Sequence, residues 1–532
     1  MRIYHHVPRI AVFLAILVLG GCAWRVIRDP SVLVETLPVD PPTLNPIIAT
    51  DVSSSEVNRY IYESLLERDN KTLELVPHLA RRWEVSPDHL SYTFWLREGV
   101  SWHDGQPLTV DDILYTFERI RDPQVDAARL RNYFRDVKRI EKVGKDAVRF
   151  VYAYPYFKAL EICGGAPIIP KHIFDDGSDF NSHGANRAPV GTGPYRFVEW
   201  KTGRRISLER FDGYWKEVPK IAGIVYKIVP DQTVAFQLLK KGALDLSTIR
   251  AIQWVRQTES ESFAEKFVKY RYYLPNYSYI GWNMRRPFFA DRRVRQAMTM
   301  LVNRKAILKE VLFGQGEVVV SNFYRFGRNY DSSIEPYSYD PESASRLLDE
   351  AGWIDHDVDG LRDRDGVPFR FSLLISSGSR FGRSLGLFLR EDLSKVGIDM
   401  EIRQLEWAAM LKLVQEHSFD AVSMAWSTPL EEDPYQVWHS SQAREGSNII
   451  GFVNLRADGI IERARREFDP HRRAALYREF QTIVHQEQPY TFLFTTPSLV
   501  VVAKRFEDVV DYRLGLDPLE WKIGPWPVLK EW

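Results

Sequence analysis

The lack of linkers constrains this 532-residue chain more than any single motif does. After Pro30 no Pro-, Gly- or Ser-rich stretch longer than a few residues interrupts the sequence, and it shows neither a repeat nor a low-complexity tract. Domains joined by flexible linkers would show such stretches between them. At about 150 residues per domain the length suits three or four units. We therefore expect one compact body whose domains are interleaved.

Strand and helix patterns alternate along the chain. Residues 398–402, 406–416 and 419–426 have the composition of a strand, a helix and a second strand with short links between them. Residues 206–246 follow a comparable order. Strands that alternate with helices in this way are typical of α/β lobes.

Two helix starts are marked by local polar residues. Thr109 with Asp112 three residues later forms a capping box, which predicts a helix through Ile120. Asp340 and Pro341 provide an N-cap and a first-turn proline for a helix that should stop before Gly352.

The N-terminal residues predict export. Two arginines within residues 1–9 precede an uncharged run, Ile10–Leu19, which is shorter than the roughly 20 residues that a membrane-spanning helix needs. The sequence Leu-Gly-Gly that follows and ends at Cys22 resembles a bacterial lipobox, which implies a signal peptide at 1–21 and a lipidated Cys22. The alternative is an ordinary signal with a chance cysteine. Cys163 would then be the only other cysteine, so stability must come from a packed core.

Composition excludes several functions. The chain has 71 basic and 71 acidic residues, so no net field would gather nucleic acid or an acidic membrane. Aromatic residues make up 13% of the chain, which suits a core and also a large, adaptable cleft. Hydrolase, zinc and phosphate-loop motifs are missing, and the twelve histidines have no ligand spacing. We expect neither an enzyme nor a cofactor.

A series of motifs follows in a fixed order along the chain. They are Pro77–Ala80 with Trp83, YTFWLREGVSWHDGQPLTVDD from Tyr92, PVGTGPYRF from Pro189, GYW from Gly213, GALDL from Gly242 and FADRRVRQAM from Phe289. As a set they resemble the family 5 extracellular solute-binding proteins, which are the peptide, dipeptide and nickel receptors of ABC importers.

This resemblance implies an α/β, periplasmic-binding-protein-like type II fold with two lobes around a ligand cleft and an inserted third domain. We place the first lobe at 22–67 and 188–283, the insertion at 68–187, the second lobe at 284–490 and the return to the first lobe at 491–532. The implied function is a monomeric, lipid-anchored, extracytoplasmic receptor. It would capture peptides and deliver them to separate permease subunits.

The resemblance also implies where the cleft lies. Two segments should line it, one at Thr50, Asp51 and Val52 and the other at Trp426, Ser427 and Thr428, where backbone groups can pair with an extended ligand. For Trp426 the alternative is a core tryptophan at a strand end. Five residues at the expected lobe crossings are equally compatible with cleft and core: Tyr279, Trp282, Asn283, Phe492 and Phe494.

One position departs from the peptide receptors. They carry an aspartate three residues after the cleft tryptophan, where it binds the ligand's ammonium group, whereas this chain has Pro429. Proline cannot pair with a cation. We therefore expect a longer, blocked or modified peptide, or a non-peptide solute such as a nickel chelate or sugar, unless Glu431 or Glu432 replaces the aspartate. A lipid-anchored hydrolase is a more distant alternative.

An acidic turn at Asp355–Gly366 resembles part of a calcium loop. Asp355, Asp357, Asp359 and Gly360 match four EF-hand positions, but Gly366 stands where a bidentate glutamate is required. A solvated hairpin turn is favoured, and we predict no metal.

Overall fold

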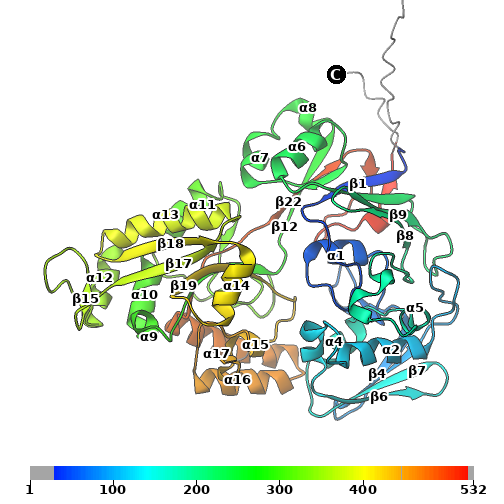
Figure 1. Ribbon diagram of the computed structural model, residues 1–532, viewed down its shortest axis with the longest axis horizontal. Coiled ribbons are helices and arrows are strands. Elements are labelled where there is room, and N and C mark those ends of the chain that lie inside the picture. The colour runs from blue at the N-terminus through cyan, green and yellow to red at the C-terminus, as the bar shows by residue number, and fades with distance from the viewer. Residues whose placement is uncertain (1–28, 445, 525–532) are drawn as a thin grey trace, which may run out of the picture.

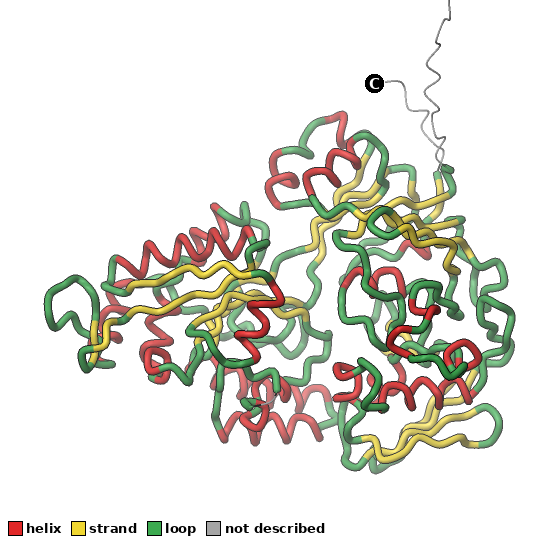
Figure 2. The backbone as a smooth tube through the Cα atoms, viewed as in Figure 1, coloured by secondary structure: helices red, strands yellow, loops and turns green. Residues whose placement is uncertain are grey.

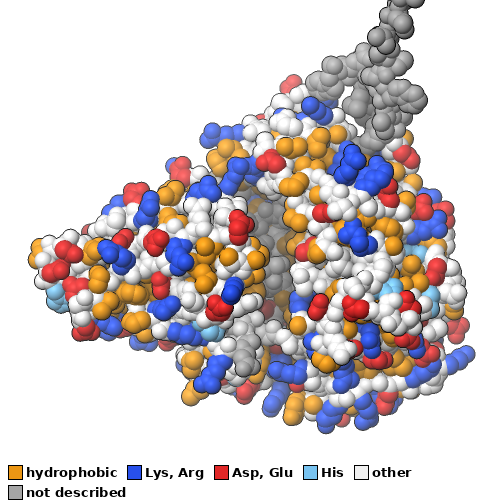
Figure 3. Space-filling view, in the orientation of Figure 1, with side chains coloured by type: hydrophobic (Ala, Val, Ile, Leu, Met, Phe, Trp, Pro, Cys, Tyr) orange, Lys and Arg blue, Asp and Glu red, His pale blue; other side chains and the backbone are white. Residues whose placement is uncertain are grey.

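The computed structural model describes residues 29–444 and 446–524. It forms two lobes separated by a deep groove, which is visible in the space-filling view (Figure 1, Figure 3). Cys22 and the proposed signal peptide lie outside the described residues. Within those residues, none of the helices combines the length and apolar character needed to cross a membrane.

The first lobe contains two sheets. One has the order β1-β10-β9-β8, with β1 and β10 parallel and the other pairs antiparallel. The other has the order β11-β22-β12 and is antiparallel. The strands are β1 (Val32–Leu37), β8 (Tyr195–Lys201), β9 (Arg205–Arg210), β10 (Gly223–Ile228), β11 (Leu246–Thr248), β12 (Phe267–Tyr272) and β22 (Ser498–Ala503). Helices α1 (Val52–Asn58) and α6 (Gln232–Lys240) belong to this lobe.

The second lobe is built on a mixed sheet of order β18-β17-β19-β13-β20, in which β18, β17 and β19 are parallel. Helices flank its strands (Figure 2), and α13 packs against β17 and β18. The strands are β13 (Asn276–Trp282), β17 (Arg370–Ser376), β18 (Asp399–Leu405), β19 (Ala421–Ser427) and β20 (Tyr490–Phe492). The main helices are α10 (Arg292–Met300), α12 (Pro341–Glu350), α13 (Arg380–Ser394), α14 (Trp407–Gln415), α16 (Leu455–Arg466) and α17 (Pro470–Glu487).

A third region follows α1 in the chain and lies below the first lobe in Figure 1. Its antiparallel sheet has the order β4-β5-β7-β6, and α2 packs against β6 and β7. The elements are β4 (Ala80–Val85), β5 (Ser91–Leu96), α2 (Val110–Arg121), β6 (Val137–Val143), β7 (Ala147–Tyr152) and α4 (Ala159–Gly165). We call residues 68–187 the inserted region; these limits remain a prediction.

Local sequence accounts for several of these elements. The expected capping box forms at the start of α2, where the Thr109 backbone N–H donates to Asp112 Oδ2 at 2.8 Å. Asp340 caps α12 by accepting from the Ser343 N–H at 2.9 Å. After α12 the chain adopts a positive φ of 82° at Gly352, which ends the helix as predicted.

The glycines at 191 and 193 permit a close approach of two backbone segments. The Gly193 N–H donates to the Ile61 carbonyl at 2.9 Å. A Cβ at Gly191 would stand 1.8 Å from the Ile61 oxygen, and one at Gly193 would stand 2.5 Å from the Tyr60 oxygen. Both glycines therefore hold the chain against the residues that follow α1 and position that part of the first lobe.

The chain passes between the lobes twice. β12 continues into β13, and β21 (Phe494–Thr495) continues into β22. The paired strands β12 and β22 belong to the first lobe, whereas β13 lies in the central sheet of the second. These two crossings provide the covalent connection around which the lobes could rotate.

Candidate functional site

The carboxyl ends of parallel strands face the groove from both lobes. In the first lobe β1 and β10 end together at Leu37 and Ile228. In the second, the parallel strands β17, β18 and β19 end at Ser376, Leu405 and Ser427. Ligands of α/β sheets bind in the crevice outside such ends. The groove between the lobes is therefore the candidate binding site.

A cavity of about 350 Å³ opens at the carboxyl edge of the first lobe. It includes residues of both crossing strands, Tyr272 of β12 and Val500 of β22, so it lies where the crossings meet this lobe. Its other main lining residues are Glu35, Thr36, Leu37, Val52, Glu56, Arg59, Tyr60, Tyr226, Val229, Gln232 and Leu516. Sequence reasoning had selected only Val52 among them.

Among the described residues, three charged side chains line this cavity. Burial, reinforced by the neighbouring Glu56 carboxylate, raises the pKa of Glu35 to about 8. Arg59 Nη1 lies 3.6 Å from Glu56 Oε2, and the Tyr226 hydroxyl donates to the Glu56 backbone oxygen at 3.1 Å. The cavity thus holds two carboxyl groups and one guanidinium, which suits a solute that carries a hydrogen-bond acceptor or a positive group.

The predicted residues at the start of α1 have different surroundings. Thr50 is exposed, and Val52 is 72% exposed and lines the cavity. Asp51 is the N-cap of α1, and its Oδ1 accepts from the Ser54 N–H at 2.8 Å. The Asp51 side chain therefore stabilises the helix that carries Val52 and Glu56.

In the second lobe Trp426, Ser427 and Thr428 lie at the end of β19, at the groove edge of the sheet. The Thr428 N–H donates to the Pro275 carbonyl at 3.0 Å, and the Trp426 indole lies beside the Tyr279 and Tyr490 hydroxyls. The Thr428 hydroxyl oxygen is buried and has no hydrogen-bond partner among the described residues. Trp426 is half-buried, so it is neither a plain core residue nor a freely exposed one.

Sequence reasoning missed Trp407. This side chain is 50% exposed, and it begins α14 immediately after β18 ends. Figure 1 places α14 beside the gap between the lobes. A tryptophan two residues after a parallel strand is the only sequence signal for it, and residues 406–416 were expected to form a helix.

The five residues at the expected lobe crossings are instead packed in the core of the second lobe, because the chain crosses between β12 and β13 and between β21 and β22. Trp282 is fully buried and donates its Nε1–H to Thr491 Oγ1 at 3.0 Å. The Asn283 side-chain amide donates to the Phe419 carbonyl at 2.7 Å. Tyr279, Phe492 and Phe494 are also buried, and Tyr279 stacks on Tyr490 at 3.9 Å between ring centroids. The core alternative accounts for all five, because their polar atoms and ring faces are turned to protein.

The three acidic side chains of the segment Glu431–Asp433 have different surroundings. Glu431 Oε2 accepts from the Asn329 amide at 3.2 Å and lies 3.6 Å from Arg473. Asp433 Oδ2 lies 3.0 Å from Arg465 Nε. Glu432 is buried, its Oε1 accepts from the Asn322 amide at 3.0 Å, and its Oε2 has no hydrogen-bond partner among the described residues. Burial raises the pKa of Glu432 to about 8.

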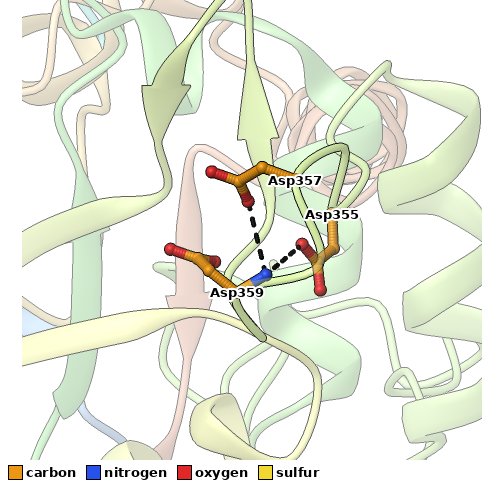
Figure 4. Close-up of side chains that lie close together, drawn as sticks. All are labelled: Asp355, Asp357 and Asp359. Carbon is orange, nitrogen blue, oxygen red and sulfur yellow. Dashed lines mark hydrogen bonds between the residues drawn. The ribbon is translucent and has the colours of Figure 1, made fainter.

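Asp355, Asp357 and Asp359 bring their carboxylates together in an outlying turn (Figure 4), with ligand atoms within 4.8 Å of one another. The Asp359 N–H is shared between Asp355 at 3.2 Å and Asp357 at 3.4 Å, and the Gly360 N–H donates to Asp355 at 3.1 Å. Hydrogen bonds to the turn's own backbone explain why these acids lie close together. The expectation of a solvated turn remains the simpler one.

Two α/β lobes around a groove edged by strand ends form a periplasmic-binding-protein-like type II fold. The model of the bacterial extracellular solute-binding proteins, family 5 Middle, matches residues 74–448. The chain belongs to the family 5 bacterial extracellular solute-binding proteins. Members of this family are extracytoplasmic solute-binding receptors.

Known proteins resemble the chain over most of its length. The oligopeptide-binding protein AppA of Bacillus subtilis is 31% identical, with 86% of this chain and 84% of the relative aligned. The dipeptide-binding protein of Escherichia coli is 27% identical, with 89% and 91% aligned. The solved structure of Bacillus subtilis AppA with a nonapeptide has a TM-score of 0.81 and 28% identity, and it covers 93% of this chain and 99% of that one.

Proposed function

We propose that this chain is the solute receptor of an ABC importer and that it encloses a peptide between its lobes. The observation that carries this proposal is the pair of parallel-strand edges that face each other across the groove. The peptide-binding relatives support the ligand class, and the exposed Trp407 provides a flat apolar contact for a side chain.

Binding without turnover is the second part of this proposal. The charged groups of the first-lobe cavity are carboxyl groups with one arginine, and its described lining contains no histidine, cysteine or lysine. We therefore expect solute to leave the protein chemically unchanged. A non-peptide solute is the alternative, since a heme-binding protein of Haemophilus influenzae is 26% identical to this chain.

The test uses the natively expressed chain. Mass spectrometry of material that co-purifies with the protein should identify peptides, and a mixture of synthetic peptides should raise its melting temperature. Chromatography of the same mixture after incubation should show no new products. A co-purified metal chelate or sugar, with no thermal response to peptides, would overturn the peptide proposal, and product formation would overturn the absence of turnover.

Attachment of a lipid at Cys22 is part of the same proposal. The motif before Cys22 supports it, and an anchored receptor stays close to the membrane in which an importer resides. The intact mass of membrane-extracted protein should correspond to a chain that begins at a modified Cys22. A mature chain with an unmodified N-terminus elsewhere would contradict this.

The ligand's ammonium group is expected to lack the usual carboxylate. Pro429 occupies that position, and both Glu431 and Asp433 are already paired with arginines. Glu432 is therefore the one acid of this segment with an unused acceptor oxygen in the structure. If no acid binds the ammonium group, N-acetylation of a bound peptide should change affinity by less than about tenfold.

A matched comparison decides between these outcomes. Affinities of a peptide and its N-acetylated form would be measured for the wild-type chain and for Glu432→Gln. Loss of an ion-pair partner in a buried site costs about 3 to 5 kcal/mol, more than a hundredfold in affinity. If N-acetylation of the peptide weakens binding to the wild type by more than a hundredfold, and this effect is absent in Glu432→Gln, then Glu432 has replaced the missing aspartate.

A further inference from the structure

The lobes also meet at a second place, far from the two chain crossings. Residues 156–158, which lead into α4 of the inserted region, contact the second lobe at the segment after β19 and at α16. Figure 1 shows α4 next to α16 and α17 at the lower end of the gap, whereas β12 and β22 cross at its upper part. The groove therefore lies between the crossings on one side and this contact on the other.

Asp433 is the centre of the contact. Its Oδ2 accepts from the Tyr156 hydroxyl at 2.8 Å and from Arg465 Nε at 3.0 Å. The Arg465 guanidinium also lies over the Tyr156 ring, 4.7 Å from its centroid. One carboxylate of the second lobe thus joins an aromatic residue of the inserted region to an arginine of α16, across 277 residues of sequence between Tyr156 and Asp433.

Lys158 provides a charged link. Its Nζ donates to the Glu431 carbonyl oxygen at 2.5 Å and lies 3.7 Å from Glu161 of its own helix. Lys158 is only 4% exposed and Tyr156 only 6%. Burial of an ammonium group is costly unless it is hydrogen-bonded. The carbonyl of the second lobe therefore contributes to the stability of the buried lysine only while the two surfaces touch.

Backbone and ring contacts complete the surface. The Phe157 N–H donates to the Arg465 carbonyl at 3.0 Å, and the Arg473 guanidinium lies over the Phe157 ring at 4.3 Å. His89 stacks on Phe468, with ring centroids 3.7 Å apart. Polar, charged and aromatic contacts together define a specific interface.

The same interface is connected to the groove. Glu431 and Asp433 follow β19 by four and six positions, and Thr428 is fixed to Pro275 between them and the strand. We propose that Tyr156, Phe157 and Lys158 are a latch that holds the lobes closed and links their closure to the end of β19. The link between the latch and solute binding rests on the proposed function. The effect of the latch on lobe closure does not require a solute.

The first experiment therefore uses protein without added solute. Small-angle scattering would compare the full chain with a Tyr156→Phe/Lys158→Met double variant and with Asp433→Ala. Both should have a larger radius of gyration than the wild type, because each removes contacts that exist only when the surfaces touch. Lys142→Met is the matched control, since Lys142 is an exposed lysine of the inserted region paired with Asp111. An unchanged radius in both latch variants would overturn the proposal.

Non-additivity provides an independent check. Combining Tyr156→Phe with Asp433→Ala should enlarge the radius hardly more than Asp433→Ala alone, because both remove the hydrogen bond between Tyr156 and Asp433. Fully additive effects would show that the residues act separately. Circular dichroism and the melting curve confirm folding; where the double variant does not fold, the conservative Tyr156→Phe is measured alone.

A synthetic peptide mixture tests the connection to binding. If only about a tenth of the molecules stay closed, the apparent affinity should fall about tenfold, since it scales with the closed fraction. Enlarged variants that bind peptides as tightly as the wild type would refute the link to β19. If neither wild type nor variants bind peptide, the proposed function fails while the scattering result still decides the latch.

Discussion

The two walls of the groove differ in how completely they enclose a glutamate. In the first lobe Glu35 borders a cavity of about 350 Å³ and has Glu56 and Arg59 close by. In the second lobe Glu432 is enclosed by protein, with Asn322 on one oxygen. Burial raises the pKa of each to about 8. The first wall can accept part of a solute without rearrangement, whereas the second is already packed.

This difference separates two kinds of residue beside the groove. Side chains of the first wall that line the cavity should affect binding more than folding. Aromatic side chains behind the second wall should affect folding, because they fill the core around β13 and β20. The following predictions test that separation, beginning with the largest effect.

Trp282→Ala should strongly destabilise the second lobe. The indole is fully buried, packs on Phe289 with ring centroids 5.0 Å apart and donates to Thr491. Truncation of such a tryptophan costs about 3 to 5 kcal/mol of unfolding free energy. Urea titration measures the loss, and the folded fraction should still bind peptide normally. A selective loss of affinity with unchanged stability would assign Trp282 to the cleft instead.

The two glutamates should give different pH profiles when each is changed to glutamine. A glutamate carboxyl whose pKa rises from its ordinary value of 4.5 to about 8 on folding contributes stability that is present below pH 4.5 and lost as pH rises through 8. Between pH 5 and pH 9, Glu432→Gln should therefore gain on the order of 4 kcal/mol relative to the wild type, given about 1.4 kcal/mol per pKa unit.

Glu35→Gln sharpens this comparison. Glu35 is only half-buried and borders the cavity, so solvent screening should make its relative gain smaller than that of Glu432→Gln. Denaturation curves at pH 5, 7 and 9 provide both values. Parallel profiles for the wild type and both variants would show that neither carboxyl has a raised pKa in the folded protein.

Trp407→Ala and Trp426→Ala form a matched pair at the edge of the second wall. Trp407 is half-exposed, so its loss should reduce peptide affinity by about 2 kcal/mol, as for a contact hot spot, and leave the melting temperature nearly unchanged. Trp426 also packs against the core, so its variant should lose both affinity and stability. Calorimetry and melting curves on one preparation compare them. An unaltered affinity in both variants would show that this edge of the sheet does not contact the peptide.

Asp51→Ala should have the smallest effect. The side chain caps α1 through the Ser54 N–H, and loss of such a cap costs about 1 kcal/mol of stability. Thr50→Ala is the control, because Thr50 is exposed and lies outside the helix. A peptide affinity that falls more than tenfold in Asp51→Ala at unchanged stability would show a direct contact with solute.

The amino-acid sequence by itself determined the family, the α/β alternation and several element ends. Thr109 with Asp112 and Asp340 with Ser343 form the expected caps because these hydrogen bonds connect residues three positions apart. Such contacts depend on local sequence alone. The ordered motifs were recognisable for a similar reason, since each one forms within a short stretch of chain.

Only the tertiary structure decided which aromatic and acidic side chains border the groove. Trp282 ends β13 and Trp407 begins α14 shortly after β18, yet one is fully buried and the other half-exposed. The local sequence pattern cannot distinguish them, because exposure depends on which distant element covers each residue. Glu35 meets its cavity, and Tyr156 meets Asp433, only after segments separated by hundreds of residues have packed together.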